Sequence, residues 1–202
     1  MKGLLYKDLL LICKQHLYIL LISFLFVGAG AVGKGNAGLS IYGIYFISTV
    51  VLNLHSLEEN YHWRTFVDSL PVSREDYVNE KYVLSIILMG VAMALFLLLS
   101  AVFGTFSSSW GILFLMVMVY LISVSLILST EMIFGIQGRS YLRIVLIMAV
   151  VLLGVGALNY SGLVLEQIAR IRILPAVLLC AGVGLFILSN RITVAIIKKR
   201  EW

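Results

Sequence analysis

Long apolar runs divide this chain of 202 residues, and they restrict its fold more than any other feature of the sequence. About 17–25 consecutive apolar residues are needed for an α-helix to cross a membrane. We expect six such spans, near residues 17–33, 39–55, 82–104, 110–130, 143–160 and 173–190. Hydrophobic residues make up 61% of the chain, against about 45–50% in an ordinary soluble domain. The sequence therefore predicts one all-α integral membrane domain, residues 1–202, with six transmembrane helices.

The basic residues are unevenly distributed between the two sides of these predicted spans. With the N-terminus placed inside, three of the 15 lysines and arginines fall on outer segments, namely Lys34, Arg170 and Arg172. The other twelve fall on inner segments, and they are Lys2, Lys7, Lys14, Arg64, Arg74, Lys81, Arg139, Arg143, Arg191, Lys198, Lys199 and Arg200. Cytoplasmic loops carry such an excess of positive charge. An even number of spans then predicts that both termini are cytoplasmic.

Two segments outside the spans are expected to lie at the membrane surface. Residues 1–16 are predicted to form an amphipathic interfacial helix, with Leu5, Leu9, Ile12 and His16 on one face and Gly3, Lys7 and Lys14 on the other. The outer segment 159–172 is semi-apolar. It is either a short re-entrant piece or a loop with an interfacial helix, and the residues leave both interpretations open.

The stretch "GAGAVGKG", Gly28 to Gly35, partly matches the phosphate-binding loop G-x-x-x-x-G-K-[ST]. However, Gly35 occupies the position of the hydroxyl that holds Mg²⁺, and the preceding run is a predicted membrane helix instead of a β-strand. We therefore expect no nucleotide site, and we find no catalytic or metal-ligand constellation and no cofactor motif. Cys13 and Cys180 are expected to be buried small hydrophobes. The sequence favours a protein that is not an enzyme.

The inner segment 56–82 is the long polar stretch of the chain. Pro71 interrupts a helix, and Ser73, three residues before Asp76, is expected to cap a helix that continues into the third span. A short helix is predicted before this break, with a mixture of charged and aromatic side chains: Glu58, Glu59, Tyr61, Trp63, Arg64, Phe66 and Asp68. Its aromatic side chains either dock a soluble partner or anchor the helix in the membrane interface.

The start "MKGLLYKDLLL", the six predicted spans and "SLPVSREDYVNEKYV" together resemble the permeases of ATP-binding-cassette type-2 transporters. More narrowly, the chain is similar to the small permeases of bacterial peptide and drug exporters, including the phenol-soluble-modulin exporters. The family pattern LP-[VIT]-[ST]-[RK]-x-x-[YIV]-[VL]-x-x-[KR]-Y is met here by Leu70, Pro71, Val72, Ser73, Arg74, Tyr77, Val78, Lys81 and Tyr82.

This resemblance implies a connecting helix at residues 1–16 and a coupling helix in the loop 56–82. The coupling helix would fit a groove on a separate ATPase subunit, and a second permease chain would complete the pathway. Tyr61, Trp63 and Phe66 would fill a pocket on the ATPase, and Glu58, Glu59, Arg64 and Asp68 would pair at its rim. Pro71, Ser73 and Arg74 would form the rigid joint to the third span. The resemblance further implies a bacterial plasma membrane and export of an amphipathic peptide, a drug or a lipid.

Glu131 follows the apolar run 112–128 and is the acid nearest to a span. Because acids at span ends cost less than acids at the centre, we expect it to form a structural ion pair with Arg139 or Arg143, and guidance of a cationic substrate is the alternative. Three other functions remain open for the chain. These are a membrane scaffold or immunity protein that sequesters a peptide, an intramembrane enzyme, and a secondary transporter.

Overall fold

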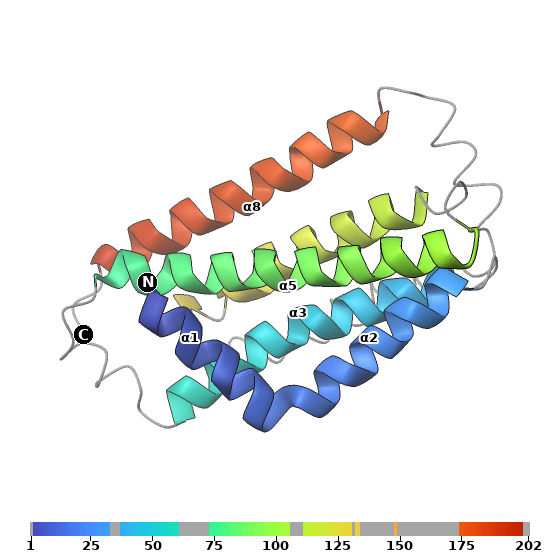
Figure 1. Cartoon of the computed structure of the whole chain (residues 1–202). Helices are drawn as coiled ribbons and strands as arrows, with labels where there is room; N and C mark the ends of the chain where they lie inside the picture. The colour runs from blue at the N-terminus through green and yellow to red at the C-terminus, as the bar shows by residue number, and fades with distance from the viewer. Residues whose placement is uncertain are drawn as a thin grey trace.

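The computed structural model describes residues 2–32, 37–60, 73–105, 111–130, 132–133, 148 and 174–199. All regular structure in these residues is helical. The helices are α1 (Lys2–Leu11), η1 (Ile12–His16), α2 (Leu17–Val32), α3 (Ala37–Asn60), α5 (Arg74–Val102) and α8 (Leu174–Lys199), with a further helix at Gly111–Thr130. Figure 1 shows α2, α3, α5 and α8 as long helices that extend along one elongated bundle.

Among the residues that the structure describes, four helices are long and apolar enough to cross a membrane, and their bounds are Gly3–Val32, Glu75–Val102, Gly111–Thr130 and Leu179–Lys199. A shorter apolar helix covers Gly38–Val51. These five helices overlap five of the predicted spans, whereas the predicted span 143–160 lies outside the described residues. The chain is therefore a multi-pass, α-helical membrane protein, and the number of six spans stays a prediction.

Helices α3 and α5 flank the predicted break after the second span. Helix α3 continues to Asn60, past the span end expected near residue 55, and α5 begins at Arg74, directly after Ser73, as predicted. Ser73 caps α5 as predicted, because its hydroxyl accepts a hydrogen bond from the backbone N–H of Asp76 at 3.0 Å. Residues 61–72, which hold Pro71 and most of the expected coupling helix, lie outside the described part of the chain.

Helices α2 and α3 pack closely through small residues. A Cβ atom added at Gly43 would lie 2.8 Å from the backbone oxygen of Ser23 and 2.8 Å from the backbone nitrogen of Val27. A Cβ added at Gly30 would lie 2.7 Å from the backbone nitrogen of Ser40. Small residues allow this close approach in membrane bundles, where van der Waals packing drives helix association. The glycines at the start of "GAGAVGKG" thus lie in a packed helix, as the sequence predicted, and Gly30 has a packing role.

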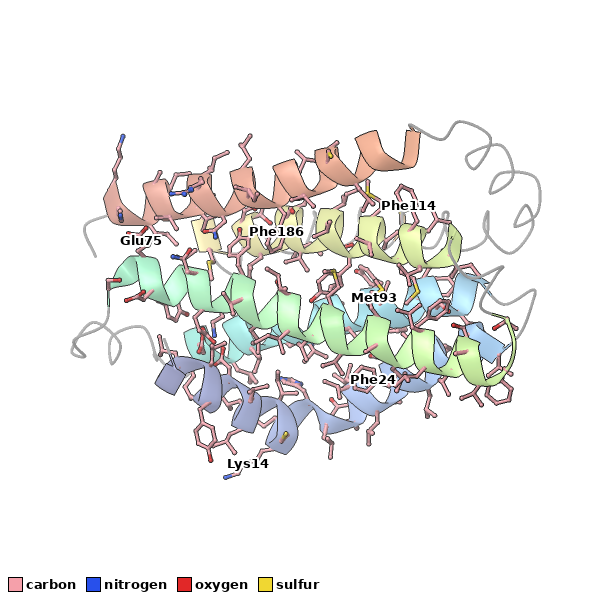
Figure 2. The ribbon with its side chains drawn as sticks, turned by 45° about the horizontal axis from the view of Figure 1, so that its top comes forward. Lys14, Phe24, Glu75, Met93, Phe114 and Phe186 are labelled. Atoms are coloured by element: carbon pink, nitrogen blue, oxygen red, sulfur yellow. The ribbon has the colours of Figure 1, made fainter. Side chains whose placement is uncertain are left out.

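The N-terminal helix presents a different face to the bundle from the one expected. Leu4, Asp8 and Ile12 are buried, whereas Leu9, which was assigned to the apolar face, is 40% exposed. Helices α1 and α2 meet at an angle (Figure 1), and the π-helix η1 lies at this bend, as is common at sharp helix kinks. Lys14 points away from the bundle in Figure 2. The reason for the rotated face is Asp8, whose carboxylate pairs with α5.

Both cysteines also differ from the prediction. Cys13 and Cys180 are exposed on the surface of the single chain and form no disulfide. Helices that cross a membrane carry apolar residues on their outer faces as well as their inner ones, so apolar neighbours in the sequence do not indicate burial.

Candidate functional site

Five charged side chains from three helices meet at one end of the bundle. They are Lys7 and Asp8 on α1, Glu58 on α3, and Glu80 and Lys81 on α5, and we refer to them as the charge cluster. Asp8, Glu80 and Lys81 are 0% exposed and Glu58 is 4% exposed. Charged side chains are almost never buried to this degree unless they are paired.

Lys81 lies at the centre of the cluster. Its ammonium nitrogen is 2.5 Å from Asp8 Oδ2 and 2.8 Å from Glu58 Oε2, so one cation links α1 and α3 to α5. Lys7 provides the second cation, with its Nζ 3.0 Å from Asp8 Oδ1 and also paired with Glu58 Oε1. Each of these two carboxylates therefore contacts both lysines.

Tyr77 completes the surroundings of Lys81. Its hydroxyl donates a hydrogen bond to Glu58 Oε2 at 2.8 Å, and its ring centroid lies 5.5 Å from Lys81 Nζ. A cation at this distance from an aromatic ring is attracted by its electrons. Tyr77 and Lys81 are four residues apart, so they share one face of α5.

Glu80 is the least satisfied member of the cluster. Neither of its carboxylate oxygens has a hydrogen-bond partner among the described residues, and Lys81 Nζ lies 3.6 Å from Oε2. With Glu80, three carboxylates face two ammonium groups. Counted over the described residues, the cluster therefore contains three acidic and two basic side chains.

We predict that Glu80→Gln changes the free energy of unfolding by less than about 1 kcal/mol, because a neutral amide of the same shape replaces a buried acid that no described cation approaches within hydrogen-bond distance. The matched change Glu58→Gln should lower stability clearly, since Glu58 is shared by two lysines and Tyr77. Unfolding in mixed detergent micelles measures both variants. A Glu80→Gln variant as unstable as Glu58→Gln would show that all three carboxylates are needed as charges.

The first turns of α5 also contact α8. The hydroxyls of Tyr82 and Ser189 are 2.8 Å apart, and the ring of Tyr82 meets that of Phe186 edge-on at 5.2 Å. Lys198 Nζ lies 2.6 Å from Glu75 Oε2, and Figure 2 shows Glu75 beside the last turns of α8. The beginning of α5 is thus joined to α1 and α3 through Lys81 and to α8 through Tyr82 and Glu75.

The structure places some of the residues expected at an ATPase contact. Glu58 differs from the expectation, because its carboxylate is directed into the charge cluster and not toward a surface rim. Glu59 lies on α3, Arg74 begins α5 and Ser73 caps it. The other expected contact residues and the span-end acid lie outside the described residues, namely Tyr61, Trp63, Arg64, Phe66, Asp68, Pro71 and Glu131. The segment 159–172 also lies outside them.

The sequence did not indicate that these five charged side chains pair with one another. Asp8 and Glu80 were not singled out, although Asp8 occurs between Leu4 and Ile12 at helical spacing. Tyr77, Lys81 and Tyr82 were recognised only as members of the family pattern. All three are buried in the structure, where Tyr77 and Lys81 contact α3 and α1 and Tyr82 contacts α8.

The fold and the charge cluster define a multi-pass helical membrane protein in which buried ion pairs join α1, α3 and α5 at one end of the bundle. Residues 3–198 match the family described as "ABC-2 family transporter protein", and the chain belongs to this family. No curated protein and no solved structure matches the chain. The match confirms the resemblance to type-2 permeases. The chain is a membrane component of an ABC transporter, a class that works with ABC ATPase subunits and is generally not catalytic itself.

Proposed function

We propose that this chain is the permease subunit of an ATP-driven exporter in a bacterial plasma membrane. Two permease chains, identical or related, would form the substrate pathway, and two separate ATPase subunits would bind beneath them. Membership of the ABC-2 family supports the partnership with ATPases. The excess of basic residues on one side of the predicted spans supports cytoplasmic termini.

The observation that carries this proposal is the position of the charge cluster beside the segment 61–72. Helix α3 ends at Asn60, two residues after Glu58, and α5 begins at Arg74, seven residues before Lys81. Both helices that flank the segment are thus joined to each other and to α1 by buried ion pairs. A displacement of residues 61–72 would therefore move α1, α3 and α5 together.

In this proposal the ATPase contact is made by residues that follow Glu58. Tyr61, Trp63 and Phe66 enter a pocket of the ATPase, and aromatic side chains often carry the binding energy of such contacts. Ion pairs at the rim of this pocket are formed by Glu59, Arg64 and Asp68. The joint between the contact segment and α5 is formed by Pro71, Ser73 and Arg74. Glu58 contributes to the coupling from inside the bundle, through its ion pair with Lys81.

The transport cycle follows from this arrangement. ATP closes the dimer of ATPase subunits and shifts the segments docked on them. The charge cluster transmits the shift to α1 and α5, and the contacts of Tyr82 and Glu75 carry it to α8. The spans then alternate between inward-facing and outward-facing states. An amphipathic peptide, a drug or a lipid is the expected cargo, because the bundle is apolar along most of its length.

We predict that Trp63→Ala abolishes the ATP-driven movement of the spans while the complex still hydrolyses ATP. Spin labels at Tyr6→Cys on α1 and Ile192→Cys on α8, both exposed sites, would follow the movement after Cys13 and Cys180 are changed to serine. Trapping with ATP and vanadate should change the label distance in the wild-type complex.

The matched control is Tyr18→Ala, which removes an aromatic side chain that is 63% exposed on α2. This variant should move like the wild type. If Trp63→Ala also shows the wild-type change of distance, Trp63 has no part in coupling.

A further inference from the structure

A groove lies between α2 and α5, toward the end of the bundle away from the charge cluster. Its volume is about 600 Å³, and it is lined by six residues of α2 between Leu21 and Val32 and by Leu95 and Leu99 of α5. Phe24, one of the lining residues, lies between these two helices in Figure 2. All eight lining residues are apolar or glycine.

Small residues give the groove its depth. Gly28 is in close contact with α5, since a Cβ added there would lie 3.0 Å from Leu99 Cδ1. Ala29 is exposed next to it and leaves a hollow that a larger side chain would fill. Leu25 forms the outer edge of the groove and is 73% exposed. The groove is therefore bounded on its inner side and accessible from the surroundings of α2.

The length of the groove matches the thickness of one leaflet of a bilayer. Leu21 and Val32 are eleven residues apart, which corresponds to about 16 Å along an α-helix. This distance is about half of the roughly 30 Å thickness of the hydrocarbon core. The groove ends at Val32, the last residue of α2, and its α5 lining, Leu95 and Leu99, lies within the last eight residues of α5, so the groove lies toward one membrane surface.

We infer that this groove holds one acyl chain of a bilayer phospholipid, in the leaflet on the side away from the charge cluster. An aliphatic chain needs no polar partner, and the lining provides none. A second copy of the chain fits less well, because a stable interface uses about 20–30 residues on each side and eight residues line the groove. Lipid tails are as apolar as leucine, so the bound chain is held by van der Waals contacts with a matching shape.

The test uses the full-length chain in nanodiscs of phosphatidylcholine that contain a fraction of molecules with a photoreactive diazirine on the acyl chain. After illumination, mass spectrometry maps the labelled residues. We expect labelling of residues 21–32 and of Leu95 and Leu99 to exceed, several-fold, the labelling of other lipid-exposed sites such as Leu98 and Leu185. Uniform labelling of all exposed faces would overturn the inference, since it would indicate ordinary lipid contact only.

Two variants make the test specific to the groove. Ala29→Trp should fill the hollow and reduce labelling of the groove several-fold. Ala101→Trp changes another exposed alanine, on α5, that does not line the groove, and it should leave the labelling map unchanged. Chemical cross-links between two chains at Leu25, lost in Ala29→Trp, would overturn the inference in favour of a second copy. The wild-type map decides the question even if a variant fails to fold, and no step of the test requires an ATPase.

Discussion

Lys81→Met is expected to lower the free energy of unfolding by about 3–5 kcal/mol, because it leaves buried carboxylates without their central cation. Lys81 is 0% exposed and contacts both Asp8 and Glu58 within 2.8 Å. Methionine keeps a similar length and replaces the ammonium by an apolar group. The remaining cation, Lys7, would then face three acids. Unfolding of the purified variant in mixed detergent micelles measures the loss.

The control is the same substitution in an exposed ion pair. Lys198 lies 2.6 Å from Glu75, but the two side chains are 54% and 42% exposed. Exposed pairs contribute at most about 1 kcal/mol, so Lys198→Met should remain close to the wild type. Equal losses of stability in the two variants would show that the buried Lys81 contributes no more to stability than the exposed Lys198.

Gly43→Leu is expected to reduce stability by about 3 kcal/mol or more, at or beyond the upper limit of ordinary overpacking. Even a Cβ atom at this position would lie within 2.8 Å of backbone atoms of Ser23 and Val27, which cannot move aside like the end of a side chain. Leucine must therefore separate α2 from α3 along their contact. The same unfolding experiment measures the effect, and cross-linking between the two helices reports their separation.

Gly90→Leu provides the matched control on α5. A Cβ added at Gly90 meets no atom within 4 Å among the described residues. Leucine also favours a helix over glycine by up to about 1 kcal/mol, so this variant should be as stable as the wild type or slightly more stable. A comparable loss in both variants would attribute the effect of Gly43→Leu to the added leucine itself and not to helix contact.

Local sequence signals predicted the local structure well. Five of the expected spans overlap helices, since twenty or so apolar residues have few other stable arrangements in a membrane. Ser73 caps α5 because the interaction joins residues only three positions apart. The family pattern around Lys81 pointed to a type-2 permease, and the match over residues 3–198 confirmed it.

Contacts between distant segments were not predictable in this way. Asp8 and Lys81 are 73 positions apart, and Lys7 and Glu58 are 51 apart. Periodicity assigned Lys7 to an outward face of the first helix because lysine is usually exposed. The acid beside it changed the outcome, since burying Asp8 requires a cation and Lys7 lies near enough to contribute. Glu58 was likewise expected at a surface. In the structure it is buried because its carboxylate pairs with Lys81.

The most direct test of the proposed function is to purify the tagged chain in mild detergent from the cells that produce it and to assay the eluate for ATP hydrolysis. Our account predicts that a soluble ATPase copurifies with the wild type and with Tyr18→Ala, and that it is lost when Trp63 and Phe66 are both changed to alanine. A folded wild-type chain that elutes without ATPase activity would contradict it. The chain would then act without an ATPase, as a scaffold or immunity protein.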